Sequence, residues 1–208
     1  MKKCISILII GLMLSLCFNV NSVSSINVEK TSTGNTLYVG GSGPGNFTKI
    51  QDAIDNATDG DTVFVYDDSS PYYENNIQIH KPLTLIGENK DTTIIDGNRD
   101  NQIIWIISND VNIYKFTIQN GDPEGIVIYE SSNILISDNV IRLNDGNGIF
   151  CDEGGYITIT RNTISNNNKR GISFNSVDGN NIVDGNSINS NGDFALSITY
   201  SVVEALHI

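Results

Sequence analysis

One pattern returns every 23 or 24 residues through the second half of the 208-residue chain. A column of isoleucines keeps this spacing: Ile95, Ile118, Ile141, Ile164 and Ile188. A column of small residues keeps it as well: Gly125, Gly148, Gly171 and Ala195. Self-similarity at a fixed period indicates stacked supersecondary units, each packed on its neighbours, rather than one globular core. The repeat therefore constrains the fold more than the composition does.

Each repeat contains three short runs with β-branched residues at alternate positions, as in residues 126–128, 134–136 and 139–141. This alternation is typical of strands with one buried face, and Asn, Asp, Gly and Ser fill the gaps as turns require. The pattern predicts an all-β fold, a right-handed parallel β-helix of about six coils. A leucine-rich repeat has a similar period, but it needs a leucine spacing and a helical segment that these units lack.

The period also predicts which side chains stack one coil apart. The isoleucine column should point inward, together with two further ladders: Ile126, Ile149, Ile172 and Leu196; and Ile128, Cys151, Phe174 and Ile198. Two columns of amides should stack at the turns: Asn139, Asn162 and Asn186; and Asn144, Asn167 and Asn191. Stacked amides hydrogen-bond along a column. The strand around Asn181 fits poorly, so we expect a bulge or a loose turn there.

The ends of the chain differ from the repeats. Two lysines, a short apolar run and a small-residue end predict a secretory signal peptide, with a membrane anchor as the alternative. The Phe47–Ala57 segment has helical spacing and predicts an end cap over the first coil. The predicted organisation is signal peptide 1–24, flexible leader 25–36, cap 37–76, β-helix repeats 77–200, and short tail or cap 201–208. Such a thin C-terminal end favours end-to-end self-association.

The mature chain is strongly acidic. Removing Lys2 and Lys3 with the signal peptide changes the net charge from −12 to −14, with 10 basic and 24 acidic residues. This charge excludes nucleic acid as a partner, because phosphates demand a basic surface. It is compatible with an extracellular location and with a loosely held Ca²⁺. Cys151 would remain alone, without an intramolecular disulfide, and its inward position predicts a small apolar residue rather than a nucleophile.

Several short segments carry a family resemblance: Leu37-Tyr38-Val39, Gly45-Asn46-Phe47, Ile50-Gln51-Asp52-Ala53-Ile54, Gly60-Asp61-Thr62-Val63, Tyr72-x-Glu74-Asn75, Lys81-Pro82-Leu83-Thr84-Leu85-x-Gly87 and Ile95-Asp96-Gly97. They resemble the opening of pectin-lyase-like right-handed parallel β-helix proteins, a superfamily that includes NosD-like periplasmic proteins and carbohydrate-binding and sugar-hydrolase modules. The resemblance covers about residues 37–200. It implies the fold but no single activity, since one fold hosts many functions.

The resemblance lets the enzyme motifs of these relatives be sought in this chain. Tyr72 and Glu74 match the opening of pectin methylesterases, but the later catalytic motifs are absent, as are those of polygalacturonases and pectate lyases. Tyr72 and Glu74 are therefore expected to be structural. The NosD-like resemblance implies copper, whose usual ligands are His, Cys and Met. After the signal peptide the chain keeps no Met, an inward Cys151, and His80 and His207 far apart, so no metal site is predicted.

Carboxylates one repeat apart are the candidate catalytic residues. Glu130 and Glu153 should stack and could cleave a glycosidic bond as an acid–base pair. Asp138 and Arg161 should also stack and could act on a uronate, as in a lyase or an epimerase. The structural alternatives are solvated turn carboxylates for the first pair and a surface ion pair for the second.

Exposed aromatic and acidic residues are the candidate ligand contacts. Tyr129 and Tyr156 could stack on sugar rings, and Asp122 and Asp145 should lie one coil apart at a turn. Asn46 and Asn56 begin glycosylation sequons. The sequence favours a secreted or cell-surface, non-enzymatic module that contacts polysaccharide or envelope glycan, without a cofactor. The alternative is a small or truncated polysaccharide-acting enzyme: a lyase, an epimerase or a glycoside hydrolase. A purely structural role in the envelope is the third interpretation, which the sequence does not separate from sugar binding.

Overall fold

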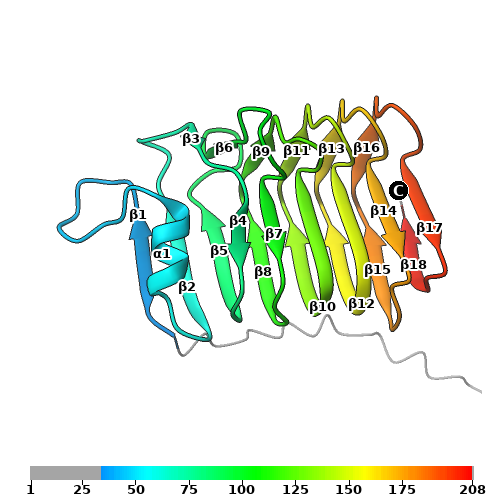
Figure 1. Ribbon diagram of the computed structural model, residues 1–208, viewed down its shortest axis with the longest axis horizontal. Helices are drawn as coiled ribbons and strands as arrows, with labels where there is room; N and C mark the ends of the chain where they lie inside the picture. The colour runs from blue at the N-terminus through cyan, green and yellow to red at the C-terminus, as the bar shows by residue number, and fades with distance from the viewer. Residues whose placement is uncertain (1–33, 208) are drawn as a thin grey trace, which may run out of the picture. The chain divides into compact units, whose positions relative to one another are not determined.

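The computed structural model describes residues 34–207, and within them the chain is a parallel β-solenoid of about seven turns with one short helix (Figure 1). The predicted signal peptide and most of the predicted leader lie outside the described residues. No helix among residues 34–207 is long and apolar enough to cross a membrane. The all-β repeat architecture predicted from the 23-residue period is confirmed.

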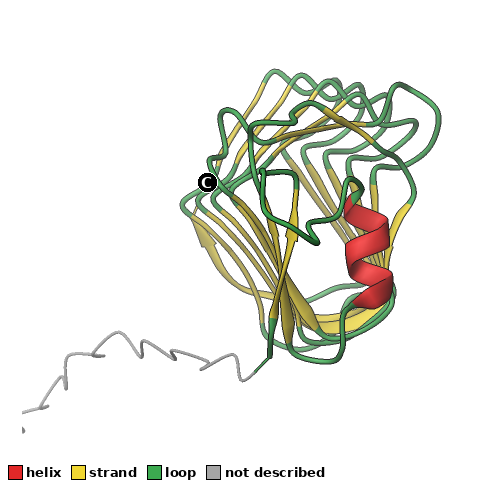
Figure 2. Ribbon diagram, turned by 90° about the vertical axis from the view of Figure 1, so that its left-hand side faces the viewer, coloured by secondary structure: helices red, strands yellow, loops and turns green. Residues whose placement is uncertain are grey.

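The coils have three faces built from parallel strands (Figure 2): two faces belong to one 12-stranded sheet, which bends at a corner within β10 and β12, and the third is a separate 6-stranded sheet. The first face contains β4 (Ile77–Ile79), β7 (Ile104–Ile106), the first part of β10 (Ile126–Ser137) and of β12 (Ile149–Thr160), β14 (Ile172–Asn175) and β17 (Leu196–Thr199). The second contains β1 (Thr36–Val39), β2 (Asp61–Val65), β5 (Leu83–Gly87), β8 (Val111–Tyr114), the later part of β10 and β12, β15 (Asn181–Asp184) and β18 (Val203–His207). The third contains β3 (Tyr72–Tyr73), β6 (Ile94–Asp96), β9 (Thr117–Gln119), β11 (Val140–Arg142), β13 (Thr163–Ser165) and β16 (Ser187–Asn189).

The stacking predicted from the period is confirmed in the strand register. The isoleucine column pairs residue for residue from β6 to β16. The two further ladders pair from β10 to β17, with Cys151 between Ile128 and Phe174. These side chains fill the centre of the solenoid and are fully buried except toward its C-terminal end. The fold is thus stabilised mainly by apolar ladders that run along its axis.

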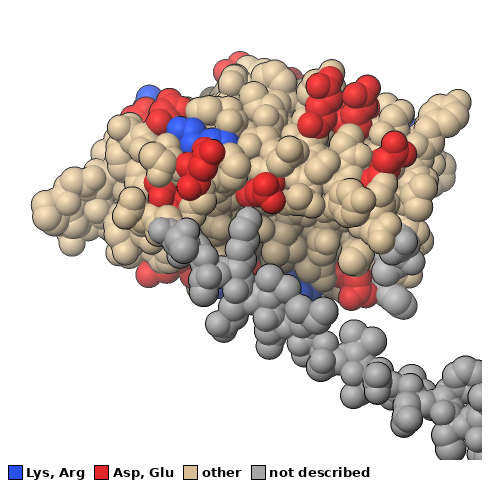
Figure 3. All heavy atoms as spheres, turned by 90° about the horizontal axis from the view of Figure 1, so that it is seen from below, with Lys and Arg blue, Asp and Glu red and all other residues tan. Residues whose placement is uncertain are grey.

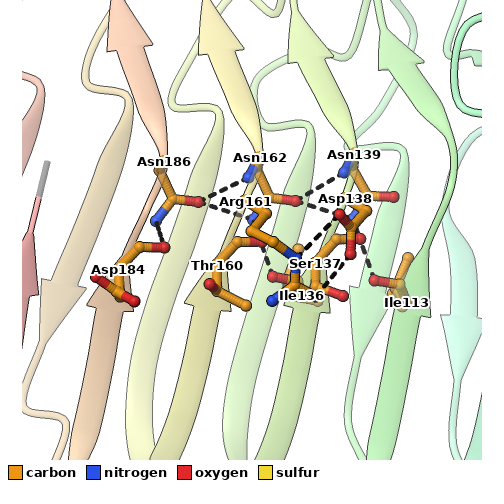
Figure 4. A network of polar contacts seen from close by, with 10 residues as sticks. All are labelled: Ile113, Ile136, Ser137, Asp138, Asn139, Thr160, Arg161, Asn162, Asp184 and Asn186. Atoms are coloured by element: carbon orange, nitrogen blue, oxygen red, sulfur yellow. Dashed lines mark hydrogen bonds and ion pairs between the residues drawn. The ribbon is translucent and has the colours of Figure 1, made fainter.

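Both predicted asparagine columns are continuous hydrogen-bonded ladders. Asn162 Oδ1 accepts from the backbone N–H of Asn139 at 2.9 Å, and Asn186 Oδ1 accepts from that of Asn162 at 2.9 Å (Figure 4). The second column repeats this arrangement from Asn144 through Asn167 to Asn191. Because these turns are buried, the amides satisfy backbone groups that water cannot reach.

The N-terminal end is closed by α1 (Ile50–Asn56), which buries Ile50, Ala53 and Ile54 against the first coils. Glu74 caps the start of this helix, because its carboxylate accepts from the backbone N–H groups of Ile50 and Gln51 at 2.8 and 3.1 Å. Lys81 caps its end by donating to the carbonyl oxygens of Asp55 and Ala57 at 3.1 and 2.8 Å. The role of Glu74 in the Tyr72-x-Glu74 motif is therefore to hold the helix.

Gln51 closes the exposed edge of the first face. Its side-chain amide accepts from the backbone N–H of Gln78 in β4 at 2.7 Å and donates to the carbonyl oxygen of Gln78 at 3.3 Å. The amide thus replaces the backbone of a preceding strand. An unpaired edge would otherwise be a template for aggregation.

Two features near the ends differ from the expected division. β1 and β2 pair in parallel with each other and with β5, so the 37–76 segment adds coils to the stack, and the turns number about seven rather than six. At the other end, within the segment expected to be a short tail or cap, residues 203–207 form β18, which pairs with β15. The bulge expected near Asn181 is present, as a shift in the β15–β18 register between Asn181 and Ile182.

We expect Asp61, at the start of β2, to make the stability of the N-terminal coils depend on pH. Its buried carboxylate accepts from the backbone N–H groups of Thr58 and Asn35 and from the Thr58 hydroxyl, all within 2.9 Å. These bonds, the backbone bond from Thr58 first, lower the pKa of Asp61 below its ordinary value of 3.8. The ionised form therefore stabilises the fold above that value, and this stabilisation is lost as pH falls through the lowered pKa.

We expect the free energy of unfolding to decrease on acidification below about pH 4, and to do so less steeply in Asp61→Asn. Urea unfolding at a series of pH values measures this, with the exposed neighbour Asp59→Asn as the control. If the free energy of unfolding decreased equally steeply with pH in Asp61→Asn and in Asp59→Asn, the stabilising role of the ionised Asp61 would be contradicted.

Candidate functional site

The two candidate catalytic glutamates lie on the corner where β10 and β12 bend. Glu130 and Glu153 are exposed neighbours, because the flanking residues Tyr129 and Asp152 pair in register. Both have left-handed backbone, with φ of 47° and 61°. Ser176 has the same conformation one coil further on, so the conformation belongs to the corner and is not local strain at a site. Seen from below, the stack shows more prominent acidic than basic side chains (Figure 3).

The candidate aromatic contacts Tyr129 and Tyr156 flank the same corner. The Tyr129 hydroxyl donates to Glu130, and this bond raises the pKa of Tyr129. The Tyr156 ring packs over Gly179, at which a Cβ would lie 3.0 Å from the ring. The two tyrosines are 39% and 58% exposed on an open corner, so each offers only an isolated surface to a ligand.

Asp138 and Arg161 form a two-pronged ion pair on the surface. Arg161 Nη2 and Nε donate to the two carboxylate oxygens of Asp138 at 2.8 and 3.1 Å (Figure 4). The hydrogen bonds from Arg161 lower the pKa of Asp138, so the carboxylate stays ionised and engaged. Both side chains are more than one third exposed, and such pairs contribute little to stability. The arrangement matches the structural alternative for this pair.

Asp122 and Asp145 lie at a turn one coil apart, and a third residue, Arg99, pairs with Asp145. Arg99, two coils before Asp145, donates to its carboxylate, and Asn168 donates to the same oxygen at 2.9 Å. Asp122 is exposed. Asp145 therefore joins turns of three coils. The Arg99 contact spans 46 residues, two repeats, so a spacing of one repeat does not predict it.

The two sequon asparagines have different environments. Asn46 Nδ2 donates to the carbonyl oxygen of Gly40 at 2.5 Å and is half-buried in the 40–46 loop. Asn56 is exposed at the end of α1, and its Nδ2 donates to the carbonyl oxygen of Asp52 at 2.8 Å. Both amide nitrogens, to which a glycan would be attached, are hydrogen-bonded to backbone.

A cleft of about 610 Å³ opens on the second face near the N-terminal end, and Asn46 is the one candidate residue expected from the sequence that lines it. One wall is the glycine-rich loop 40–46, and the other carries outward residues of β1 and of the segment after β2. Tyr38 and Tyr66 stack in it with ring centres 5.9 Å apart and an angle of 23°. Phe64 packs edge-on against Tyr66 at 5.0 Å. The cleft is therefore built around an aromatic cluster.

The loop lies close to these rings because glycines allow it. Gly40 and Gly41 have positive φ values of 72° and 70°. A Cβ on Gly41 would lie 2.7 Å from the Tyr66 ring, and one on Gly40 would lie 2.3 Å from the Tyr72 hydroxyl. Asp68 fixes the loop by accepting from the backbone N–H of Gly41 at 2.9 Å. The glycine-rich run thus has a structural role, as the wall of the cleft.

Three carboxylates line the cleft: Asp67, Asp68 and Glu88. Thr92 donates to Asp67 Oδ2 at 2.6 Å, and the Asp67 backbone N–H donates to Glu88 Oε2 at 3.1 Å. Asp68 accepts from the backbone of the loop through one oxygen. In each of the three carboxylates, therefore, one oxygen accepts a hydrogen bond and the other has no partner among the described residues. No Lys or Arg of the described chain lines the cleft. The site therefore combines aromatic faces with hydrogen-bond acceptors.

The thiol and imidazole groups that a metal such as copper prefers are not clustered into a site within residues 34–207. Cys151 is fully buried, and burial raises its thiol pKa far above the ordinary value. His80 is exposed at the end of β4. No group of three His, Cys, Asp or Glu side chains in this described part of the chain could hold a metal ion.

The family model described as NosD: Periplasmic copper-binding protein (NosD) matches residues 28–206, which include almost all of the solenoid. Among curated proteins, none matches the chain significantly.

Proposed function

The chain belongs to the NosD family of β-solenoid proteins, and we propose that it is an exported, non-enzymatic module that binds carbohydrate in the cleft beside Tyr38 and Tyr66. The stacked tyrosines are the observation that supports this best. Two parallel rings at an open cleft offer apolar faces to a sugar ring, and nearby carboxylates and the Asn46 amide can bond its hydroxyl groups.

Copper, which the family description names, does not fit the residues that the structure describes. Copper sites use imidazole, thiolate or thioether ligands arranged around one point. The described chain contains no Met, its Cys151 lies inside the core, and His80 is not part of any metal-holding group. We therefore assign no step of the function to a copper ion.

The non-enzymatic part of the proposal rests on the state of the candidate catalytic pairs. Asp138 is engaged by Arg161, and Glu130 and Glu153 lie on an exposed corner. None of these residues lines the cleft, and the three carboxylates that do, Asp67, Asp68 and Glu88, stand opposite a loop, 40–46, that contains no Asp or Glu. Glycoside cleavage needs two carboxylates on either side of a bound bond. Incubation with neutral and uronate polysaccharides should release neither reducing ends nor unsaturated uronate; release above a heat-denatured control would overturn this part.

Tyr38→Ala should weaken carbohydrate binding about tenfold, the equivalent of about 1.4 kcal/mol, because it removes half of the aromatic stack. Glycan-array screening of the full chain followed by calorimetry measures the change. Tyr73→Ala is the matched control, since Tyr73 is 71% exposed on the third face and away from the cleft. An equal loss in both variants, or none in Tyr38→Ala, would place the binding elsewhere.

A further inference from the structure

Building on the proposed carbohydrate function, we infer that the cleft selects sugars carrying a protonated amine, such as unacetylated hexosamines, over neutral sugars and against uronates. Two separate features of the cleft support this choice: the carboxylate oxygens without partners and the faces of the stacked tyrosines. Each favours positive charge on the ligand.

The carboxylates provide the first argument. Asp67, Asp68 and Glu88 each present one oxygen that accepts no hydrogen bond within the described chain. Neutral hydroxyl groups can bond to them, but an ammonium group forms stronger, charge-assisted bonds. A uronate carboxylate would meet three like charges, with no Lys or Arg of the described residues lining the cleft to offset them. The net charge of −12 adds repulsion at longer range.

The tyrosines provide the second argument. The face of an aromatic ring carries negative charge density and attracts a cation placed over it. Tyr38 is 41% exposed and lines the same cleft as the carboxylates, beside the nearly parallel ring of Tyr66. A sugar stacked on this cluster can place an amine near the unpartnered oxygens. An N-acetyl group removes the charge and with it both attractions.

The test compares oligosaccharides of equal length and linkage. Calorimetry of the full chain at about pH 6, where an amine of the α-amino type is protonated, would use glucosamine, N-acetylglucosamine and galacturonate oligomers. We expect the glucosamine oligomer to bind about tenfold tighter than the acetylated one, and the uronate to bind weakest. In the double variant Asp67→Asn, Glu88→Gln this preference should disappear, because the glucosamine oligomer loses its charge-assisted bonds, whereas the acetylated oligomer loses less affinity, since its hydroxyl groups can still bond to the new amide oxygens.

The control is an equal loss of charge elsewhere. Glu130→Gln, Glu153→Gln removes two carboxylates from the distant corner, and the preference for glucosamine should remain. A preference that survives the cleft variant, or disappears in the corner variant, would show general attraction by an acidic surface and overturn the inference. A simple polyamine that binds as tightly as the amino sugar would also overturn it.

The same experiment separates the two proposals. If the acetylated oligomer binds and Tyr38→Ala weakens it, but no oligomer is preferred, the carbohydrate function stands and the selectivity is wrong. If no oligosaccharide binds to the wild-type chain, the carbohydrate function itself fails.

Discussion

Asn162→Ala should destabilise the protein by about 3–5 kcal/mol, a large effect for a side chain that contacts no ligand. Asn162 is 1% exposed. Its Oδ1 accepts from the backbone N–H and the side-chain amide of Asn139, and its Nδ2 donates to Ile136, Thr160 and Asn186 at 2.9–3.1 Å. Truncation leaves several of these groups buried without partners, and each costs about 1–3 kcal/mol.

Urea unfolding followed by circular dichroism measures the loss. Asn189→Ala is the matched control, because Asn189 is exposed on β16 and bonds only to the Ser187 hydroxyl among the described residues. We expect the control to change the unfolding free energy by less than about 0.5 kcal/mol. Similar values for the two variants would mean that water replaces the ladder amide and that the buried bonds contribute little.

Gly148→Ala should destabilise the fold by about 2–4 kcal/mol although it adds one methyl group. A Cβ at this position would lie 2.7 Å from the Gly171 carbonyl oxygen of the next coil, 2.7 Å from Ile164 and 2.9 Å from the Asn167 amide. The backbone carbonyl of Gly171 and the amide of Asn167 cannot move away without a large cost in free energy. The coils must separate locally, which weakens the strand pairing between β12 and β14.

Ala195→Gly is the reverse change in the same column and should cost about 1 kcal/mol or less. Thermal unfolding of both variants against wild type gives the comparison. If Gly148→Ala proved as mild as Ala195→Gly, the coil spacing would be more compliant than the close contacts at Gly148 imply.

The glycine column shows how much of the regular stack could be predicted from the sequence. A Cβ at Gly125, Gly148 or Gly171 would lie 2.6–2.7 Å from the carbonyl oxygen of the column member in the next coil. Ala195 precedes β17, the last strand of its face among the described residues. Of these four positions, only the one in the last described coil carries a Cβ. A fixed period predicted these columns because it fixes the strand register.

The cleft could not be predicted in this way, because the first coils do not share the period. Along the outer positions of the second face, Tyr38 pairs with Phe64, Phe64 with Ile86 and Ile86 with Tyr114, at separations of 26, 22 and 28 residues. Columns counted at 23 residues miss these neighbours. A local signal was present: Tyr38, Phe64 and Tyr66 alternate with the buried residues of β1 and β2, which places three aromatic rings on one outward surface.

The two asparagine ladders make each central coil an interchangeable unit. Every ladder residue directs its backbone N–H toward the next coil and its side-chain oxygen toward the previous one, as from Asn139 to Asn162 and from Asn144 to Asn167. The upper surface of a coil therefore matches the lower surface of any other coil of this kind. Duplicating or deleting one such 23-residue segment leaves each ladder N–H facing a ladder oxygen, so the ladders of such solenoids allow a change of length in evolution.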